Sequence, residues 1–193
     1  ILTGGDSAEY DISLLSANTV LKHLNTNKYN GIIVHLKNGE YTVDNQKLNT
    51  SDFSYIKDNA KINFDKLFIV LHGTPAEDGL IQDYFDNMNL PYTSCNAKVS
   101  ALTFDKFECN NTLHRLGFTC ANSVVIYSDE KYLESDIIDK VGLPCFVKPN
   151  GAGSSFGITK VKEEKDLVNA INNALLHDNK VLIEQFINGT EVS

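Results

Sequence analysis

The sequence alternates strand-sized apolar runs with longer stretches in which apolar residues recur every three or four positions. The clearest apolar run in the first half is residues 67–71. Helical spacing at Leu14, Ala17 and Leu21 lies between two such runs. Strands that alternate with helices pair in parallel through right-handed crossovers. Residues 1–95 are therefore predicted to form a doubly wound α/β domain with a parallel sheet.

The pattern changes after about residue 95, where we place a domain boundary. Two short strands, residues 143–148 and 158–161, flank a glycine-rich segment, and a helix and a strand at 181–184 follow. Adjacent strands joined by a turn pair antiparallel. This order predicts an α+β subdomain over residues 96–193.

For three segments the sequence allows a more detailed prediction of secondary structure. Residues 45–63 are polar and weakly periodic, which favours a loop with a short helix. Residues 100–116 are predicted to form a single helix that ends at Gly117, because their apolar side chains share one face. Residues 128–142 are treated as a polar connection.

Composition narrows the class of protein. There are 17 Lys and Arg against 25 Asp and Glu, a net charge of −8, and a net anion does not favour nucleic acid or an anionic membrane. No apolar run approaches the ~18 residues of a membrane span, so we expect a soluble protein without either partner; the cysteines favour a cytoplasmic location. The cysteines lack the close spacing of a zinc site or of a disulfide framework, so we expect reduced thiols and no metal ligands; they are Cys95, Cys109, Cys120 and Cys145.

The glycine-rich segment, residues 149–157, is the strongest single feature. Its glycines permit close backbone approach to a ligand, and its two serines add donors. It lacks the Lys-Ser/Thr of a P-loop and lies between two strands, unlike a dinucleotide fingerprint. A flap over nucleotide phosphates fits this arrangement, and a hairpin turn without a ligand is the alternative.

Lysines near this segment favour the nucleotide interpretation. Lys148 ends an apolar strand beside the segment, where a phosphate would supply its counter-charge. Lys106 on the preceding helix would meet another phosphate. The strand that ends at Glu184 leads into Phe186 and Ile187, which suit the two faces of an adenine ring. Each of these residues taken singly is also compatible with a structural role.

In the N-terminal domain, residues 4–9 lie where a strand gives way to a helix, which is the usual ligand crevice of such sheets. His72 follows the strand 67–71 and is expected at the same edge. The alternative is structural: Asp6 as a helix cap, with Glu9 three residues on, would form a capping box.

Together these segments resemble the ATP-grasp enzymes of the D-alanine–D-alanine ligase type. Seven blocks in the same order, spread over nearly the whole chain, are much more specific than any one of them. They are Gly4–Glu9 with Ile12-Ser13, His72-Gly73 with Glu77–Gly79, Leu90–Thr93, Ser100-Ala101 with Asp105-Lys106, Phe146–Pro149, Gly153–Gly157 and Val181–Glu184. The resemblance implies a pre-ATP-grasp domain followed by an ATP-grasp subdomain with a glycine-rich flap.

The resemblance also implies a reaction in peptidoglycan precursor synthesis. ATP phosphorylates the carboxylate of one D-alanine, and the amine of a second attacks the acyl phosphate. Glu9 and Ser154 would be catalytic residues. The first D-alanine would meet Glu9, Ile12, Ser13, His72 and Glu77. ATP would meet Lys106, Lys148, Gly153, Ser154, Ser155, Glu184, Gln185, Phe186, Ile187 and Glu191.

Some features depart from the family. Ala152 stands where an acidic residue is common before Gly-Ser-Ser. The family's Mg²⁺ ligands and the arginine that stabilises the transferring phosphoryl group are expected beyond residue 193, since the only arginine here is Arg115. We therefore expect the C-terminal ATP-grasp part to be absent and residues 1–193 alone to be inactive.

Three alternatives stay open at this point. In the first two, the enzyme is a ligase whose acceptor is D-lactate or D-serine instead of D-alanine. In the third, the chain is a non-catalytic ATP-binding module. Glu9, His72 and Ser154 together count against the module, because a plain nucleotide binder does not need amino-acid-site residues. The resemblance further implies a homodimer.

Overall fold

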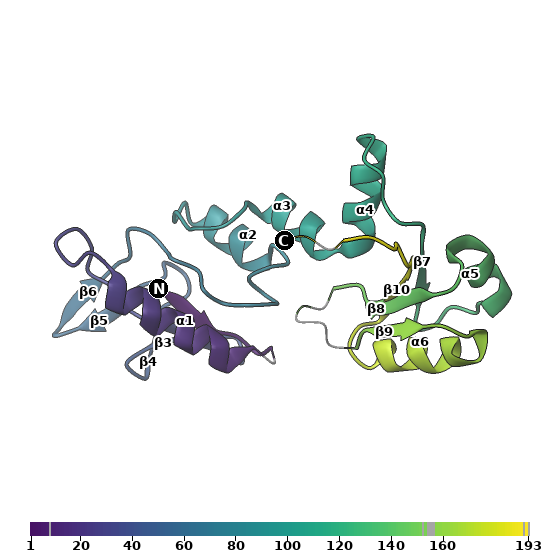
Figure 1. The fold of residues 1–193 in the computed structure, drawn as a ribbon. Helices are drawn as coiled ribbons and strands as arrows, with labels where there is room; N and C mark the ends of the chain where they lie inside the picture. Colours follow the sequence, from purple (N-terminus) through teal and green to yellow (C-terminus); the bar gives the residue numbers. More distant parts are fainter. Residues whose placement is uncertain (8, 152, 154–156, 191, 193) are drawn as a thin grey trace. The chain divides into compact units, whose positions relative to one another are not determined.

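The structure, a computed structural model, describes residues 1–7, 9–151, 153, 157–190 and 192 (Figure 1). The chain divides into two compact units, Ile1–Ala101 and Leu102–Ser193. The division falls within α3 (Ala97–Phe104). The predicted boundary near residue 95 precedes this helix and stays a prediction.

The N-terminal unit contains a sheet with the order β1-β2-β3-β4. β1 and β2 are parallel, and two further parallel bridges join Leu2 to Ile69 and Leu67 to Tyr92. The predicted strand at 67–71 therefore belongs to the parallel sheet through isolated bridges only. The elements are β1 (Leu2–Gly4), α1 (Tyr10–His23), β2 (Val34–Lys37), β3 (Glu40–Val43), β4 (Gln46–Lys47), β5 (Tyr55–Lys57), β6 (Ala60–Ile62) and α2 (Leu80–Asn87).

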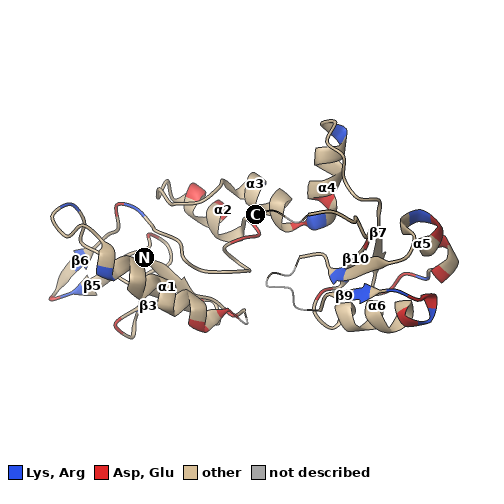
Figure 2. Cartoon of the chain, in the orientation of Figure 1, with Lys and Arg blue, Asp and Glu red and all other residues tan. Residues whose placement is uncertain are grey.

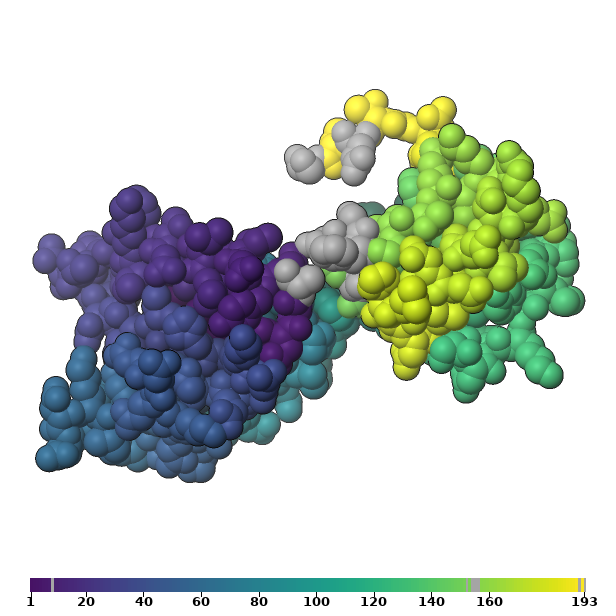
Figure 3. All heavy atoms as spheres, turned by 90° about the horizontal axis from the view of Figure 1, so that it is seen from below, coloured from purple at the N-terminus to yellow at the C-terminus, as the bar shows by residue number. Residues whose placement is uncertain are grey.

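Helices cover both faces of this sheet. Thr3 of β1 contacts Ser13 of α1, with 2.8 Å between the hydroxyl oxygens. The neighbouring Leu2 shares a buried cluster with Ile81 and Phe85 of α2. Successive side chains of a strand point to opposite faces, so α1 and α2 lie on opposite sides. The doubly wound α/β class is confirmed, but the predicted parallel sheet is a mixed one, since β2, β3 and β4 pair antiparallel. The first residues of the chain, which include α1, are purple in Figure 3.

The assignment of residues 45–63 to a loop with a short helix was wrong. The segment forms β4, β5 and β6, and its hairpin turns are Asp44-Asn45 and Asp58-Asn59. All four turn residues have positive φ, which Asp and Asn tolerate and which two-residue hairpins require. Phe53 between the hairpins is buried against Phe85, with 4.9 Å between ring centroids.

The C-terminal unit is the predicted antiparallel α+β subdomain. Its sheet has the order β7-β10-β8-β9 with antiparallel pairs throughout. Apolar side chains of α5 and α6 pack on one face of this sheet. The elements are α4 (Lys106–Arg115), β7 (Ser123–Tyr127), α5 (Glu134–Val141), β8 (Cys145–Pro149), β9 (Thr159–Val161), a 3₁₀ turn (Glu164–Asp166), α6 (Leu167–Leu175) and β10 (Lys180–Gln185).

One predicted helix in this region was wrong, and another helix was not predicted. The predicted single helix 100–116 is two helices, α3 and α4, because Asp105 has extended backbone and caps α4 by accepting from the Glu108 N–H at 2.9 Å. The polar connection 128–142 contains α5, which buries Ile137 and Val141 on one face.

Candidate functional site

The carboxyl end of β1 is a tight turn held by α1. The Gly4 N–H donates to the Ser13 hydroxyl at 2.8 Å, and Thr3 contacts the same hydroxyl. Gly4 has φ +100, and a Cβ there would overlap the Leu36 carbonyl oxygen. Only glycine fits this approach. Ser13, predicted to bind substrate, is fully buried and fixes the turn in this structure.

The turn lies against the segment that carries His72. The Ser7 hydroxyl donates to the His72 carbonyl at 3.1 Å. The His72 Nδ1 lies 3.8 Å from the Glu77 carboxylate. Its Nε2 atom is buried and has no hydrogen-bond partner within the described residues. A buried polar atom of this kind is costly unless something satisfies it, so it is available to a bound polar group.

The capping-box alternative for Asp6 and Glu9 is not what the structure contains. Asp6 Oδ1 accepts from the Asn38 N–H at 2.8 Å. The Glu9 N–H donates to the Ser7 hydroxyl at 3.2 Å instead. Glu9 is half-buried at the start of α1, beside the His72 edge of the sheet. Ile12, also predicted to bind substrate, is 55% exposed.

The C-terminal unit contains a pocket of about 510 Å³ on one face of its sheet. Its lining combines two aromatic rings, apolar side chains and one charge pair, and includes Lys148, Glu184 and Ile187 of the predicted nucleotide site. The lining residues are Phe146, Lys148, Ile158, Glu184, Phe186, Ile187, Gly189 and Thr190. A small planar apolar group with polar edges fits such a lining.

A carboxylate orients the lysine of this pocket. Lys148 Nζ lies 2.6 Å from Glu184 Oε2, and Asn110 Nδ2 donates to Glu184 Oε1 at 2.8 Å. Lys148 and Glu184 side chains are 20% and 17% exposed, so the pair is partly desolvated. Asn110 lies on α4, and no feature of the sequence pointed to it.

Lys106 is a second cation close to the first. Its Nζ donates to the Asn150 carbonyl at 3.0 Å. Burial lowers the pKa of Lys106, and the nearby charge of Lys148 lowers it further. Two neighbouring ammonium groups are stabilised by an anion of high charge density. Figure 2 marks the basic positions at the start of α4 and on β9 in blue.

The base of the flap is anchored by polar side chains that sequence reasoning missed. Buried Asn150 accepts from the Phe107 N–H through Oδ1 at 2.9 Å. Asp178 accepts from the Gly151 N–H at 2.6 Å. Lys180 Nζ pairs with Asp105 at 2.8 Å. Because their partners are far away in sequence, spacing alone did not identify them.

Five further residues were predicted to bind ATP, and the structure describes two of them, Gly153 and Gln185. Gly153 is exposed, and the side chain of Gln185 accepts from the Asn122 N–H at 3.4 Å. Ser154, Ser155 and Glu191 lie outside the described residues, so their predicted roles stay predictions.

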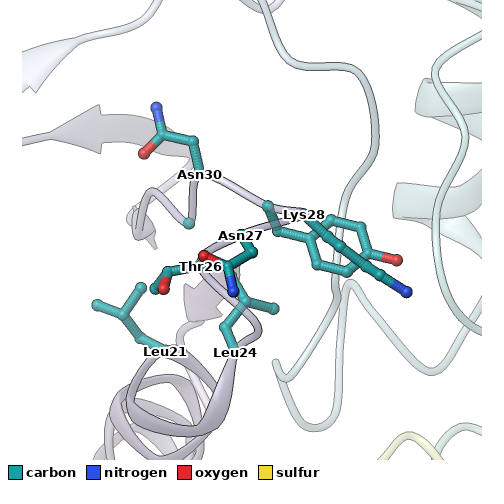
Figure 4. Close-up of a pocket in the computed structure, with 8 residues that line it drawn as sticks. Leu21, Leu24, Thr26, Asn27, Lys28 and Asn30 are labelled. Atoms are coloured by element: carbon teal, nitrogen blue, oxygen red, sulfur yellow. The ribbon is translucent and has the colours of Figure 1, made fainter.

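A second hollow, of about 420 Å³, lies at the other end of α1. Figure 4 shows Leu21 and Leu24 from the helix end beside Thr26, Asn27, Lys28 and Asn30 of the following loop. None of the predicted site residues lines it. Its single charged side chain, Lys28, has no ion-pair partner among the described residues. This hollow is not a candidate catalytic site.

The described residues contain neither a metal-binding cluster nor a membrane-spanning helix. No group of three or more His, Cys, Asp or Glu is arranged there to hold a metal ion. Within the same part of the chain, no helix combines the length and apolarity needed to cross a membrane.

Two family models match the chain. The model described as D-ala D-ala ligase N-terminus matches residues 1–95, and the model described as D-ala D-ala ligase C-terminus matches residues 112–193. Curated relatives named D-alanine--D-alanine ligase match over the whole chain, with 41% identity in Phocaeicola vulgatus and 44% in Flavobacterium johnsoniae. The chain spans 61% of the length of each.

Solved structures agree in fold. D-alanyl-alanine synthetase A from Vibrio cholerae has a TM-score of 0.86 and 28% identity, covering 97% of this chain and 58% of its own. VanG D-Ala:D-Ser ligase from Enterococcus faecalis has a TM-score of 0.82 and 32% identity, covering 97% and 62%. D-alanine--D-alanine ligase from Bacillus anthracis complexed with ATP has a TM-score of 0.78 and 26% identity, covering 97% and 58%.

Proposed function

The chain belongs to the D-alanine–D-alanine ligase family, and from this premise we propose that it forms the amino-acid-binding and nucleotide-binding parts of an ATP-dependent ligase. The ligase joins two D-alanines into D-alanyl-D-alanine for peptidoglycan precursor synthesis. The observation that carries the proposal is the pocket that gathers Lys148, Glu184, Phe186 and Ile187 on one sheet face, with Lys106 close by.

In the proposed reaction, a carboxylate oxygen of the first D-alanine attacks the γ-phosphorus of ATP, and ADP leaves. The amine of the second D-alanine then attacks the acyl carbon. Phosphate departs and a proton is lost from nitrogen, which leaves a peptide bond. The charge that must be stabilised lies on phosphoryl oxygens, so positioned cations matter more than a covalent nucleophile.

The N-terminal unit supplies the first amino acid's site in this proposal. Glu9 binds the ammonium group of the first D-alanine, and His72 offers its buried Nε2 to the same molecule. Ser13 holds the Gly4 turn that shapes the site. Contacts from Ile12 and Glu77 and closure by Ser154 remain part of the proposal on family resemblance alone.

The C-terminal unit supplies the nucleotide site. Lys106 and Lys148 bind phosphate oxygens, and the counter-charge relieves the repulsion between the two ammonium groups. Phe186 and Ile187 flank the adenine, while Glu184 fixes the Lys148 ammonium and Gln185 lies at the same strand end. Gly153 and Ser155 cover the phosphates, and Glu191 meets the ribose.

Mg²⁺ is part of the proposed ATP chemistry, where it would neutralise phosphate charge. The described residues do not form a donor set for it. We place its ligands in sequence that the longer relatives have beyond the matched part. For the same reason residues 1–193 alone are proposed to lack turnover. A cytoplasmic location and a homodimer are further parts of the proposal that rest on the family.

The experiment measures ADP release from MgATP by the complete gene product, with and without D-alanine. D-alanine-dependent release, with D-alanyl-D-alanine identified by mass, supports the ligase. ATP binding without release under either condition would support the non-catalytic ATP-binding module instead.

A second candidate differs only in the acceptor. The 32% identity to the VanG D-Ala:D-Ser ligase favours a test of D-serine as the acceptor, and D-lactate is tested in the same way. Competition of each acceptor against D-alanine, read as the mass of the product, separates these ligases.

A further inference from the structure

A third lysine lies beside the aromatic end of the nucleotide pocket. The Nζ of Lys160 on β9 is 3.4 Å from the ring centroid of Phe186 and 5.6 Å from that of Phe146. The two rings are 5.9 Å apart and inclined at 54°. The ammonium group therefore contacts both aromatic walls of the pocket.

Strand register places this lysine on the pocket face of the sheet. Phe146 of β8 is opposite Lys160 on one side and opposite Glu184 on the other. Residues in one cross-strand row point to the same face, so these three side chains share it. Cys145, Val147 and Val161 point the other way and are buried in the core with α5 and α6.

The surroundings of Lys160 differ from those of Lys148. Lys148 is held by the Glu184 carboxylate. No carboxylate of a described residue lies within ion-pair distance of Lys160, and aromatic faces are its recorded partners. An ammonium group over an aromatic ring within about 6 Å of its centroid is attracted to the ring's electron-rich face.

We propose that Lys160 is a positioning residue for the nucleobase: its ammonium fixes the Phe186 ring as one wall of the base pocket. This inference rests on the proposed function. Phe186 directly follows β10, and its N–H donates to the Pro144 carbonyl at 3.2 Å, which holds the backbone but does not orient the ring. The orientation of the ring depends on side-chain contacts, and the contact with Lys160 is closer than the contact with the Phe146 ring.

The inference separates the base end of the pocket from its phosphate end. If Lys160 orients the Phe186 ring against the base, its loss lowers the affinity for ADP and for ATP by the same factor, because both nucleotides carry adenine. If its ammonium binds the terminal phosphate instead, its loss lowers the affinity for ATP more than that for ADP. The expected loss is about three- to tenfold in affinity, given the usual strength of a partly exposed cation–π contact.

The test is calorimetric binding of ADP and ATP to the complete gene product and to three variants. Lys160→Met keeps the apolar stem and removes the charge, and it should weaken both nucleotides about equally, with kcat nearly unchanged and the KM for ATP raised. Lys160→Arg retains a cation over the ring and should restore affinity. Lys162→Met, an exposed lysine two residues on, is the matched control and should match the parent.

The outcomes are distinguishable. A parent protein that binds neither nucleotide overturns the proposed function and this inference together. A parent that binds, with Lys160→Met unchanged, overturns the inference alone. A selective loss of ATP over ADP also overturns it, because the lysine would then be a phosphate ligand. Equal thermal melting of the Met and Arg variants excludes a difference in folding as the cause.

Discussion

The two candidate sites are built from different parts of the polypeptide. In the N-terminal unit the site edge is formed by backbone: Gly4, Gly5 and the His72 carbonyl are held by short hydrogen bonds to Ser13, Leu36 and Ser7. In the C-terminal unit the site is formed by side chains on one face of the sheet, where Lys148, Glu184 and Phe186 line a pocket of about 510 Å³.

This difference determines how each site tolerates change. A site edge formed by backbone is disrupted when a side chain is added, because a carbonyl oxygen cannot move without breaking the sheet. A pocket formed by side chains is disrupted when a charge is removed, since the partner of that charge is left partly buried and unpaired. The first kind of change is expected to affect folding, and the second to affect binding.

The largest expected effect follows addition of one methyl group at Gly4. Gly4→Ala places a Cβ on the Leu36 carbonyl in a backbone conformation with φ +100. We expect a loss of more than about 3 kcal/mol in the free energy of unfolding, since strain and overlap add. Urea denaturation of the chain measures it.

The control is Gly39→Ala in the exposed turn between β2 and β3. Gly39 also has positive φ, +74, but no atom lies within 4 Å of its added Cβ. Its cost should be about 1 kcal/mol, from the backbone alone. Equal losses at the two glycines would contradict the steric account of the Gly4 turn.

The next effect concerns the charge pair in the nucleotide pocket. Lys148→Ala removes a proposed phosphate ligand and leaves the Glu184 carboxylate with the Asn110 amide as its side-chain partner among the described residues. We expect the KM for ATP to rise by about ten- to a hundredfold, the usual range for a lost charge-assisted contact. Steady-state kinetics and calorimetry of ATP measure it.

Lys165→Ala is the control for Lys148. Lys165 pairs with Glu163, but both side chains are more than 60% exposed. An exposed pair contributes little, so ATP affinity should not change. Unaltered nucleotide affinity in Lys148→Ala would remove that lysine from the proposed site.

A smaller effect is expected at the amino-acid end. Glu9→Gln removes the charge proposed to meet the ammonium of the first D-alanine and keeps the side-chain shape. The KM for the first D-alanine should rise about tenfold, and that for ATP by much less. Asp11→Asn, an exposed acidic residue on the same helix, is the control. Equal changes in both KM values would favour a structural role for Glu9.

The smallest effect is a pH dependence of stability in the C-terminal unit. Burial opposes ionisation of Asp105, but hydrogen bonds from Lys180 and the Glu108 N–H outweigh it and lower the pKa of the carboxyl. A lowered pKa adds stability that is complete above the unfolded value of about 4 and is lost as the pH falls through the folded value.

Asp105→Asn should therefore flatten the acid side of the stability curve and cost about 1 kcal/mol at neutral pH. Asparagine still caps α4, so the helix start is retained. Thermal melting between pH 2.5 and 5 measures the change. Asp139→Asn, exposed on α5, should leave the curve as it is. An unchanged acid limb in Asp105→Asn would show that the pair with Lys180 adds no stability.

Local patterns were sufficient for most of the fold. The alternation of apolar runs and helical spacing predicted the α/β class, and the strand–glycine–strand order predicted the antiparallel C-terminal sheet. Errors arose where turn chemistry was overlooked: Asp44-Asn45 at the start of the segment assigned as a loop with a short helix, and Asp58-Asn59 within it, were hairpin signals. The break at Asp105 was missed because helical periodicity continues across it.

The sequence by itself determined the family, the order of the elements and the residue types expected around ATP and an amino acid, because these depend on local spacing and on blocks in a fixed order. Tertiary structure alone decided which side chains meet. Asn110 reaches Glu184 across 74 positions. Lys160 on β9 reaches Phe186, which follows β10, because β8 pairs antiparallel with both strands and brings them close together. Such pairs depend on strand register and on chain reversal, and neither is encoded at any fixed spacing along the chain.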